Sequence, residues 1–185
     1  MSRSGFALFA TAIGRCGLAW GPDGLVGVQL PEASVAATMA RLWRRFPGFE
    51  IAKPPPPAAE AIARITAFLA GAADDFRDLA LDFGEASDLD RSVYAAARAI
   101  PAGTTITYGA LAARLGDPAL ARAVGQALGR NPWPILVPCH RITAAEGRMG
   151  GFSAPGGTAT KLKLLEIEGA LAAETLPLFG GPVQS

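Results

Sequence analysis

Cysteine and histidine are scarce in this chain. Its 185 residues contain two cysteines, Cys16 and Cys139, and one histidine, His140. Two cysteines can form at most one disulfide, so a disulfide-stapled secreted scaffold is excluded and we predict two free thiols. A structural zinc site needs about four soft ligands, which these three residues do not supply, so no metal is expected.

Long apolar runs are also absent. No run approaches the roughly 20 residues that a membrane-spanning helix needs. The apolar patch near the N-terminus is interrupted by Gly5, Gly14 and Arg15, too early for a signal peptide. Half of the residues are hydrophobic and 18% are charged, which is typical of a well-packed globular chain. We therefore expect a soluble cytoplasmic protein that does not bind membranes.

The net charge is low but unevenly distributed. The formal total of +1 would by itself disfavour a nucleic-acid partner. Residues 91–150, however, contain seven arginines and two acidic residues, a net charge of +5, whereas residues 1–86 carry −1. A basic half joined to a near-neutral half indicates a local anion-binding surface. A solvated arginine-rich surface without a ligand explains the charge equally well.

Residues 1–86 are expected to form a small α+β domain. The run KPPPP looks like a domain linker, but the segment before it is too short to hold a core alone. We interpret it as a stiff surface connection inside the domain. Hydrophobic periodicity and Gly, Pro and Asp punctuation predict a hairpin-linked sheet over residues 6–30, helices over 34–46 and 58–71, and a closing strand over 76–83.

A second domain is expected over residues 87–170, followed by a tail over residues 171–185. The amphipathic helix SDLDRSVYAAARAI opens it, and two short helices, TYGALAARLG and PALARAVGQALG, follow. Asp117 is a good N-cap for the second short helix, and Pro118 suits its first position. Two short helices with a glycine-containing turn are typical of a helix-turn-helix, although many helical hairpins share this pattern.

The second short helix has two different faces. At about 100° per residue, its bulky apolar residues share one side and Arg122 stands on the other. Glycine inside a helix costs roughly 1 kcal/mol relative to alanine, so the small residues around Arg122 need a reason. Close approach to a nucleic-acid groove is one reason, and simple helix packing is the other. The apolar side comprises Leu120, Val124 and Leu128, and the small or polar side Ala119, Gly125, Gln126 and Gly129.

The stretch ILVPCHRI, residues 135–142, places Cys139 beside His140 at the end of an apolar run that is predicted to be a strand. A cysteine in such a position is most often buried and inert. Neighbours in an extended chain point to opposite faces, so a direct hydrogen bond between the pair needs a local bend or a water molecule.

The C-terminal helix TATKLKLLEIEGA favours a reactive pair. Glu168 falls on its apolar face, and a buried carboxylate needs a partner, for which His140 and Arg141 are the candidates. Glu168 orienting His140, and His140 deprotonating Cys139 directly or through water, is the generalised triad arrangement for nucleophilic catalysis. A free thiol needs such help at neutral pH because only the thiolate is a competent nucleophile.

The loop GRMGGFSAPGGT, residues 147–158, contains five glycines and one proline. The backbone N–H groups of such a loop can approach a ligand closely. Neither a GKS or GKT sequence nor a GxGxxG pattern is present, so a nucleotide triphosphate site is not expected.

Five segments resemble, in order and spacing, the methylated-DNA–protein-cysteine methyltransferase family, the O6-alkylguanine-DNA alkyltransferases. The resemblance extends over residues 87–170, and Pro-Cys-His-Arg is its most specific part. It implies an α+β fold, with a small ribonuclease H-like N-terminal α/β domain and a winged helix-turn-helix-like catalytic domain. The segments are Tyr108-Gly109, ARAVGQALGRNP (121–132), ILVPCHRI (135–142), GGFSAPGG (150–157) and TKLKLLEIEG (160–169).

The resemblance implies catalytic roles for five residues. Cys139 takes the alkyl group from guanine O6 in one irreversible transfer, His140 acts as its base through a water molecule, and Glu168 holds His140. Tyr108 donates to the flipped base and helps the O6 leaving group depart. Asn131 fixes the turn between the recognition helix and the active-site segment.

The resemblance also implies contacts to DNA and substrate. Arg122 is the finger that enters the base stack where the damaged nucleotide leaves. Ser153 binds O6 through its backbone N–H, and the carbonyls of Cys139 and Ile142 bind the guanine amino group. Arg141 is counted with the substrate-binding residues. The implied partner is double-stranded DNA containing O6-alkylguanine, bound by a monomer without a protein partner, cofactor or metal.

One departure from the family concerns Ala154-Pro155, which stands where many relatives have consecutive glycines. We expect this change to alter which bulky alkyl groups fit.

Three other functions compete with this interpretation. A non-catalytic sensor of alkylated DNA is the main alternative, but such relatives carry tryptophan in place of Cys139. A regulator that reads DNA sequence is disfavoured, because Arg122 and Gln126 are the only long exposed side chains on the candidate helix. A Cys-His hydrolase is disfavoured because its two residues are not usually adjacent in sequence.

Overall fold

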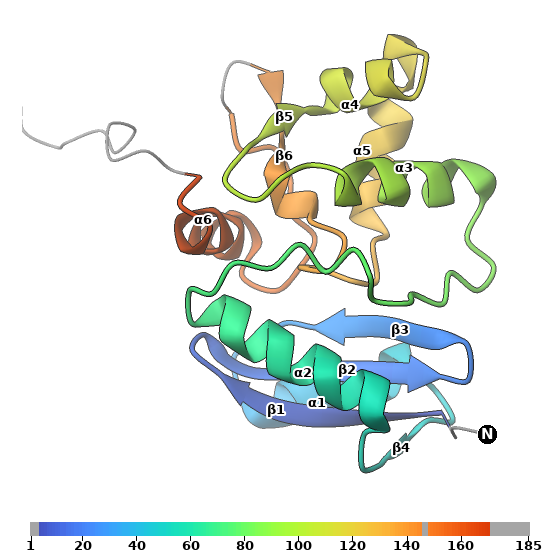
Figure 1. The fold of residues 1–185 in the computed structure, drawn as a ribbon, viewed down its shortest axis with the longest axis vertical. Helices are drawn as coiled ribbons and strands as arrows, with labels where there is room; N and C mark the ends of the chain where they lie inside the picture. Colours follow the sequence, from blue (N-terminus) through green and yellow to red (C-terminus); the bar gives the residue numbers. More distant parts are fainter. Residues whose placement is uncertain (1–3, 146–147, 171–185) are drawn as a thin grey trace, which may run out of the picture.

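The structure, a computed structural model, describes residues 4–145 and 148–170 and has the expected α+β fold (Figure 1). A mixed sheet with two helices forms the N-terminal part, and a mostly helical part follows. The first part contains β1 (Gly5–Thr11), β2 (Gly14–Gly21), β3 (Gly24–Gln29), α1 (Val35–Arg45), β4 (Glu50–Ile51) and α2 (Pro56–Leu69). The second contains α3 (Asp88–Arg98), β5 (Ile106–Thr107), α4 (Tyr108–Arg114), the 3-10 helix η1 (Pro118–Leu120), α5 (Ala121–Gly129), the 3-10 helix η2 (Cys139–Arg141), β6 (Ile142–Thr143) and α6 (Gly157–Ile167).

The N-terminal sheet has the strand order β3-β2-β1-β4, with β4 parallel to β1 and the other pairs antiparallel. Side chains alternate between its faces, so Leu18 and Trp20 join the cluster beneath α2, whereas Ala19 joins Leu42 of α1. The two helices therefore cover opposite faces of the sheet, as Figure 1 shows. The predicted hairpins are confirmed, and so is the interpretation of KPPPP as a connection within this part, because α2 packs on the same sheet.

One continuous hydrophobic core joins the two parts of the chain. Trp133 lies at their junction, where its ring packs against Phe83 and Tyr94 and its Nε1 donates to the carbonyl of Leu25 at 2.7 Å. The carbonyl of Pro132 accepts from the backbone N–H of Val28 at 2.9 Å, so β3 holds the segment that leads to Cys139. The boundary at residues 86 and 87 stays a prediction, and the predicted tail over 171–185 lies outside the described residues.

Two predicted strands are wrong. Residues 76–83 form turns and make only one isolated bridge, between Leu81 and Leu25, because Phe76 has a φ of 53° that breaks the extended chain. The apolar run from Ile135 to the Pro138-Cys139 step is not a strand either: Ile135 has a φ of 79°, and the proline at 138 leads into η2. Among the described residues, no helix is long and apolar enough to cross a membrane.

Candidate active site

The helix pair predicted from the sequence is present, with one difference at its turn. The carboxylate of Asp117 accepts from the backbone N–H of Ala119, which starts the 3-10 helix η1, and α5 begins only at Ala121. Asp117 therefore caps the segment that begins at Pro118, as predicted, but the first turn of that segment is a 3-10 helix and not part of α5. Val124 and Leu128 of α5 are buried in the core, whereas Arg122 is exposed.

The small residues on the exposed side of α5 are not required by packing within the protein. A Cβ added to Gly129 would meet nothing within 4 Å, and one added to Gly125 would only touch the Tyr108 ring at 3.9 Å. Both glycines line a cavity beside this helix. Packing within the protein therefore does not explain these two glycines. The other explanation, close approach by a ligand, is kept.

Only part of the basic surplus of residues 91–150 is free at the surface. Arg122 has no hydrogen bond or ion pair within residues 4–145 and 148–170, so its side chain is available to a ligand. Four of the other arginines are committed to the protein, two through backbone carbonyls and two through carboxylates: Arg91, Arg98, Arg130 and Arg141. The count of +5 thus overstates the charge that DNA would meet.

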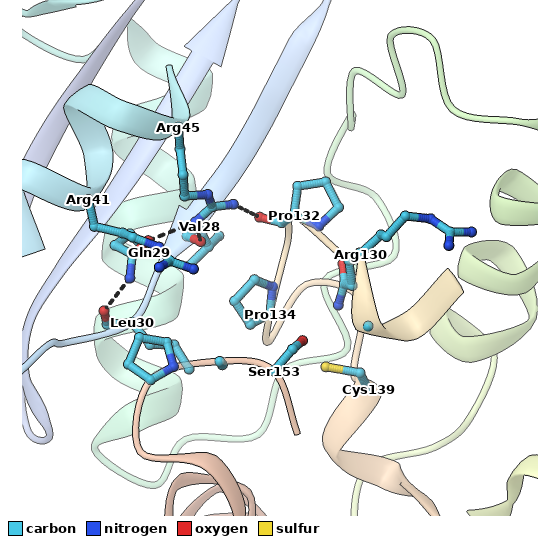
Figure 2. A pocket seen from close by; sticks show the side chains of 14 residues that line it. Val28, Gln29, Leu30, Arg41, Arg45, Arg130, Pro132, Pro134, Cys139 and Ser153 are labelled. Carbon is cyan, nitrogen blue, oxygen red and sulfur yellow. Dashed lines mark hydrogen bonds between the residues drawn. The ribbon is translucent and has the colours of Figure 1, made fainter. Parts of the chain in front are cut away.

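Cys139 is the first residue of η2 and lines two cavities, the smaller of which is drawn in Figure 2. The larger, of about 480 Å³, is open to solvent on one side and is lined by Tyr108, Phe152 and the glycine face of α5. The smaller, of about 270 Å³, lies between the two parts of the chain. Ser153 lines both cavities, and in Figure 2 its hydroxyl and the Cys139 sulfur point toward each other.

The two cysteines have different environments. Cys16 is fully buried in the sheet, and burial raises the pKa of its thiol to about 11, so it is inert at neutral pH. Burial also raises the pKa of Cys139, while a hydrogen bond from Asn131 and the charge of Lys161 act to lower it. Cys139 is therefore a thiol at neutral pH that borders open space, and it needs a base to become a nucleophile.

His140, which follows Cys139 in the chain, is the candidate for that base. Its Nε2 lies 2.8 Å from Oε1 of Glu168, and both side chains are almost completely buried. Burial lowers the pKa of His140, so the ring is neutral at pH 7. Because an ionised Glu168 only accepts, Nε2 carries the proton and Nδ1 is an acceptor. Nδ1 is buried and has no hydrogen-bond partner within the described part of the chain.

Glu168 is ionised because two side chains donate to it. Burial acts to raise its pKa, but hydrogen bonds from His140 and Arg141 lower the pKa to about 2. Nη2 and Nε of Arg141 donate to the carboxylate at 2.6 and 3.0 Å, and Nη1 donates to the carbonyl of Ile100. The guanidinium of Arg141 is thus buried, and each of its three nitrogens donates a hydrogen bond within the protein. The expectation that Arg141 binds substrate is corrected: it holds Glu168.

Tyr108 and Asn131 stand beside Cys139. Tyr108 is the first residue of α4, and its phenol donates to the carbonyl of Gly151 at 3.3 Å; burial raises its pKa. The Asn131 side chain accepts from the N–H of Trp133 and donates to the carbonyl of Val137, both at 2.9 Å. Asn131 therefore closes the irregular loop between α5 and η2.

The two carbonyl oxygens that are expected to bind guanine each already accept one hydrogen bond within the protein. The Cys139 carbonyl accepts the N–H of Ile142, and the Ile142 carbonyl accepts from Lys161. A carbonyl oxygen has two lone pairs, so each can accept a further hydrogen bond.

The sequence analysis missed Lys161, which is completely buried on α6. Its Nζ donates to the carbonyls of Ile142 and Met149 and lies 6.0 Å from the centroid of the Tyr108 ring. Its charge acts to lower the pKa of Cys139. The reasoning that placed Glu168 on the apolar face of this helix would have found Lys161, because it lies seven residues earlier on the same face.

Methionine in place of Lys161 is expected to slow reaction at Cys139 about tenfold. Loss of the charge raises the pKa of the thiol further, and one pKa unit changes the thiolate fraction about tenfold. The check is the rate of Cys139 alkylation by iodoacetamide across pH, with thermal unfolding as a test of integrity. Lys163→Met is the matched control, since Lys163 is exposed on the same helix and pairs with the exposed Glu166. Equal rates in both variants would contradict the role of Lys161.

The site thus combines a cysteine, a buried neutral histidine and the carboxylate that holds it with a helix face whose Arg122 has no partner among the described residues. These are the parts of a group-transfer protein that binds nucleic acid. Sequence comparison agrees: the family described as 6-O-methylguanine DNA methyltransferase, DNA binding domain, matches residues 88–170.

Individual relatives extend this match over most of the chain. A methylated-DNA–protein-cysteine methyltransferase from Methanothermobacter thermautotrophicus is 35% identical over 153 residues, which cover 83% of this chain and 78% of that protein. The chain belongs to the methylated-DNA–protein-cysteine methyltransferase family. The structure of the Mycobacterium tuberculosis protein OGT in complex with DNA has a TM-score of 0.71 and 32% identity, covering 89% of this chain and 92% of that one. A DNA base-flipping protein from Thermus thermophilus is 45% identical over 108 residues, 58% of this chain and 70% of that protein.

Proposed function

We propose that Cys139 takes an alkyl group directly from O6 of a guanine in double-stranded DNA, in one irreversible step. The observation that carries this assignment is the buried Glu168–His140 pair, in which Nδ1 of His140 has no hydrogen-bond partner among the described residues. His140 directly follows Cys139, which lines two cavities. The protein itself is a DNA-repair methyltransferase that acts on O6-methylguanine.

The chemistry of this step balances without a cofactor. His140 takes the proton of the Cys139 thiol through a bridging water molecule, and Glu168 stabilises the imidazolium that forms. The sulfur attacks the alkyl carbon, the bond from that carbon to O6 breaks, and the electron pair passes to the guanine, which is protonated. The product is a thioether. Because a thioether does not return the alkyl group, each molecule acts once.

The larger cavity is assigned to the guanine. Tyr108 forms one side of it and donates to the extruded base as O6 becomes a leaving group. The backbone N–H of Ser153 binds O6, and the carbonyls of Cys139 and Ile142 accept from the guanine amino group. Asn131 keeps the loop before Cys139 in place.

The target atom lies inside the base stack, so the nucleotide must be extruded, which costs a few kcal/mol. Arg122 is exposed on a face of α5 that otherwise carries small residues, and its side chain fills the gap that the extruded base leaves in the stack. We assign DNA binding and transfer to residues 87–170, with residues 1–86 supporting the loop that leads to Cys139. The assignments to a monomer and to the cytoplasm stay predictions.

Alanine in place of Arg122 is expected to weaken duplex binding and repair together, by roughly 5- to 30-fold. That factor corresponds to about 1–2 kcal/mol of the extrusion cost. Binding is measured by fluorescence anisotropy at one fixed salt concentration, and repair by single-turnover kinetics. Arg114→Ala is the control, because Arg114 is an exposed arginine on the neighbouring helix. If Arg122→Ala repairs duplex DNA at the rate of the Arg114 variant, the finger role is wrong.

Stoichiometry separates repair from damage sensing. With excess duplex, loss of O6-methylguanine is expected to stop at one lesion per protein molecule. Continued turnover would contradict a single irreversible transfer. Retained preference for the damaged duplex without any loss of O6-methylguanine would favour the non-catalytic sensor.

A further inference from the structure

The smaller cavity beside Cys139 is lined by cations from the N-terminal part of the chain. Arg41 and Arg45 of α1 face it from one side, and Cys139, Ser153 and Pro134 from the other (Figure 2). Its volume of about 270 Å³ exceeds that of a two-carbon acid several times, since a water molecule occupies about 30 Å³. Arg130 also borders the cavity, but its guanidinium turns away to pair with Asp90 at 2.8 Å.

The charge of Arg45 has no counter-ion among the described residues. Its guanidinium donates to the carbonyls of Val28 and Pro132 and to the side-chain oxygen of Gln29, at 2.8, 3.0 and 2.9 Å. All three acceptors are uncharged. A partly buried cation held only by neutral groups is stabilised by an anion that enters the cavity.

Arg41 is the more adaptable of the two arginines. Within the described residues its one charged partner is Glu32, whose Oε1 lies 4.0 Å from Nε of Arg41, too far for a strong hydrogen bond. Glu32 does not line the cavity, whereas Arg41 does. Its guanidinium can therefore reorient toward an anion without breaking a good contact.

The geometry of transfer sends part of a larger substrate into this cavity. In an in-line displacement the sulfur, the carbon under attack and O6 lie on one line, so other substituents on that carbon project sideways. The guanine occupies the larger cavity, and the smaller one meets it at Cys139 and Ser153. Ala154 and Pro155 form part of the wall of the smaller cavity.

We propose that this arginine-lined cavity receives the distal end of larger O6-alkyl groups and favours groups that end in a carboxylate. The proposal rests on the transfer function assigned to Cys139. With O6-carboxymethylguanine, the sulfur forms a bond to the methylene carbon and the bond from that carbon to O6 breaks. The proton of the thiol leaves through His140, and the guanine is protonated. The product is S-carboxymethylcysteine with its carboxylate beside Arg41 and Arg45.

The test compares duplexes that carry O6-carboxymethylguanine or its amide, O6-carbamoylmethylguanine. The two groups have nearly the same shape, so the ratio of their single-turnover rates, divided by the same ratio for reaction with a free thiol, reports the effect of charge in the cavity. We expect the acid to react about tenfold faster, the effect of one charge-assisted hydrogen bond. In Arg41→Gln the ratio is expected to fall toward one. Arg44→Gln, an exposed arginine of the same helix, is expected to keep the wild-type ratio.

Each other outcome overturns a specific statement. If the wild-type protein repairs O6-methylguanine but reacts equally with acid and amide, the carboxylate preference is wrong and the transfer function stands. If Arg41→Gln slows both substrates equally, Arg41 acts on the DNA backbone and the proposal fails. If no substrate reacts, including O6-methylguanine, the transfer function itself is wrong.

Discussion

Alanine in place of Cys139 is expected to abolish alkyl transfer and to leave binding to alkylated duplex DNA within about twofold of the wild-type value. The sulfur is the only atom that receives the alkyl group, so its removal leaves no alternative route. Its loss enlarges an existing cavity and leaves the bonds among His140, Arg141 and Glu168 intact. Transfer is measured as loss of O6-methylguanine from the duplex, and binding by anisotropy at fixed salt, because phosphate contacts make affinity salt-dependent.

The other cysteine provides the matched control. Cys16 is fully buried in the sheet, and burial raises its pKa to about 11. Cys16→Ala is expected to cost about 1 kcal/mol of stability and to repair DNA normally. Residual transfer by Cys139→Ala, or loss of transfer in Cys16→Ala alone, would show that the nucleophile has been assigned to the wrong residue.

Glutamine in place of Glu168 is expected to destabilise the protein and to slow transfer. The change leaves the buried Arg141 without a counter-ion, and breaking a buried ion pair costs about 3–5 kcal/mol. An amide also permits the wrong tautomer of His140, because it can donate to Nε2. The analogous change in a serine protease costs about 10⁴-fold. We expect at least about 100-fold slower transfer, measured on protein shown to be folded by circular dichroism, with stability from urea unfolding.

Two further variants separate stability from chemistry. Glu166→Gln, on the exposed face of the same helix, is expected to change neither quantity. The double variant Glu168→Gln with Arg141→Gln removes both buried charges, so it is expected to regain stability but not transfer. Recovery of transfer in the double variant would mean that Glu168 acts only through folding.

The pH dependence of this stability follows from the low pKa of Glu168. Its pKa is about 2 in the folded protein, below the ordinary value of 4.5. The ion pair therefore contributes fully above pH 4.5 and loses its contribution as the pH falls toward 2. The difference in unfolding free energy between wild type and Glu168→Gln is expected to shrink over that range. A constant difference would contradict an ionised Glu168.

Local signals in the sequence were sufficient for most of the fold. Ser34 and Ser87 each accept a hydrogen bond from the first turn of the helix that follows, as their residue types predict. The hairpins follow from Gly, Pro and Asp between apolar runs. The predicted strand over 76–83 failed because its apolar residues are buried by a bent chain, which alternation alone cannot distinguish from a strand.

The site was less predictable, since it depends on contacts between distant segments. Helical spacing placed Glu168 on a buried face and offered two partners, but it could not show that Glu168 binds both His140 and Arg141. The arginines that line the smaller cavity, Arg41 and Arg45, could not be predicted from the sequence for the same reason. Arg45 donates a hydrogen bond to the carbonyl of Pro132, which lies 87 positions later in the sequence, and no local sequence pattern predicts such a contact.

The most direct test of the account is the mass of the intact protein after it reacts with a short duplex containing O6-methylguanine. We predict a single gain of one CH₂ unit, mapped to the peptide that contains Cys139 and absent with unmodified DNA. A methyl group on any other residue, or an unchanged mass despite tight binding to the damaged duplex, would contradict the assignment of Cys139 as the acceptor.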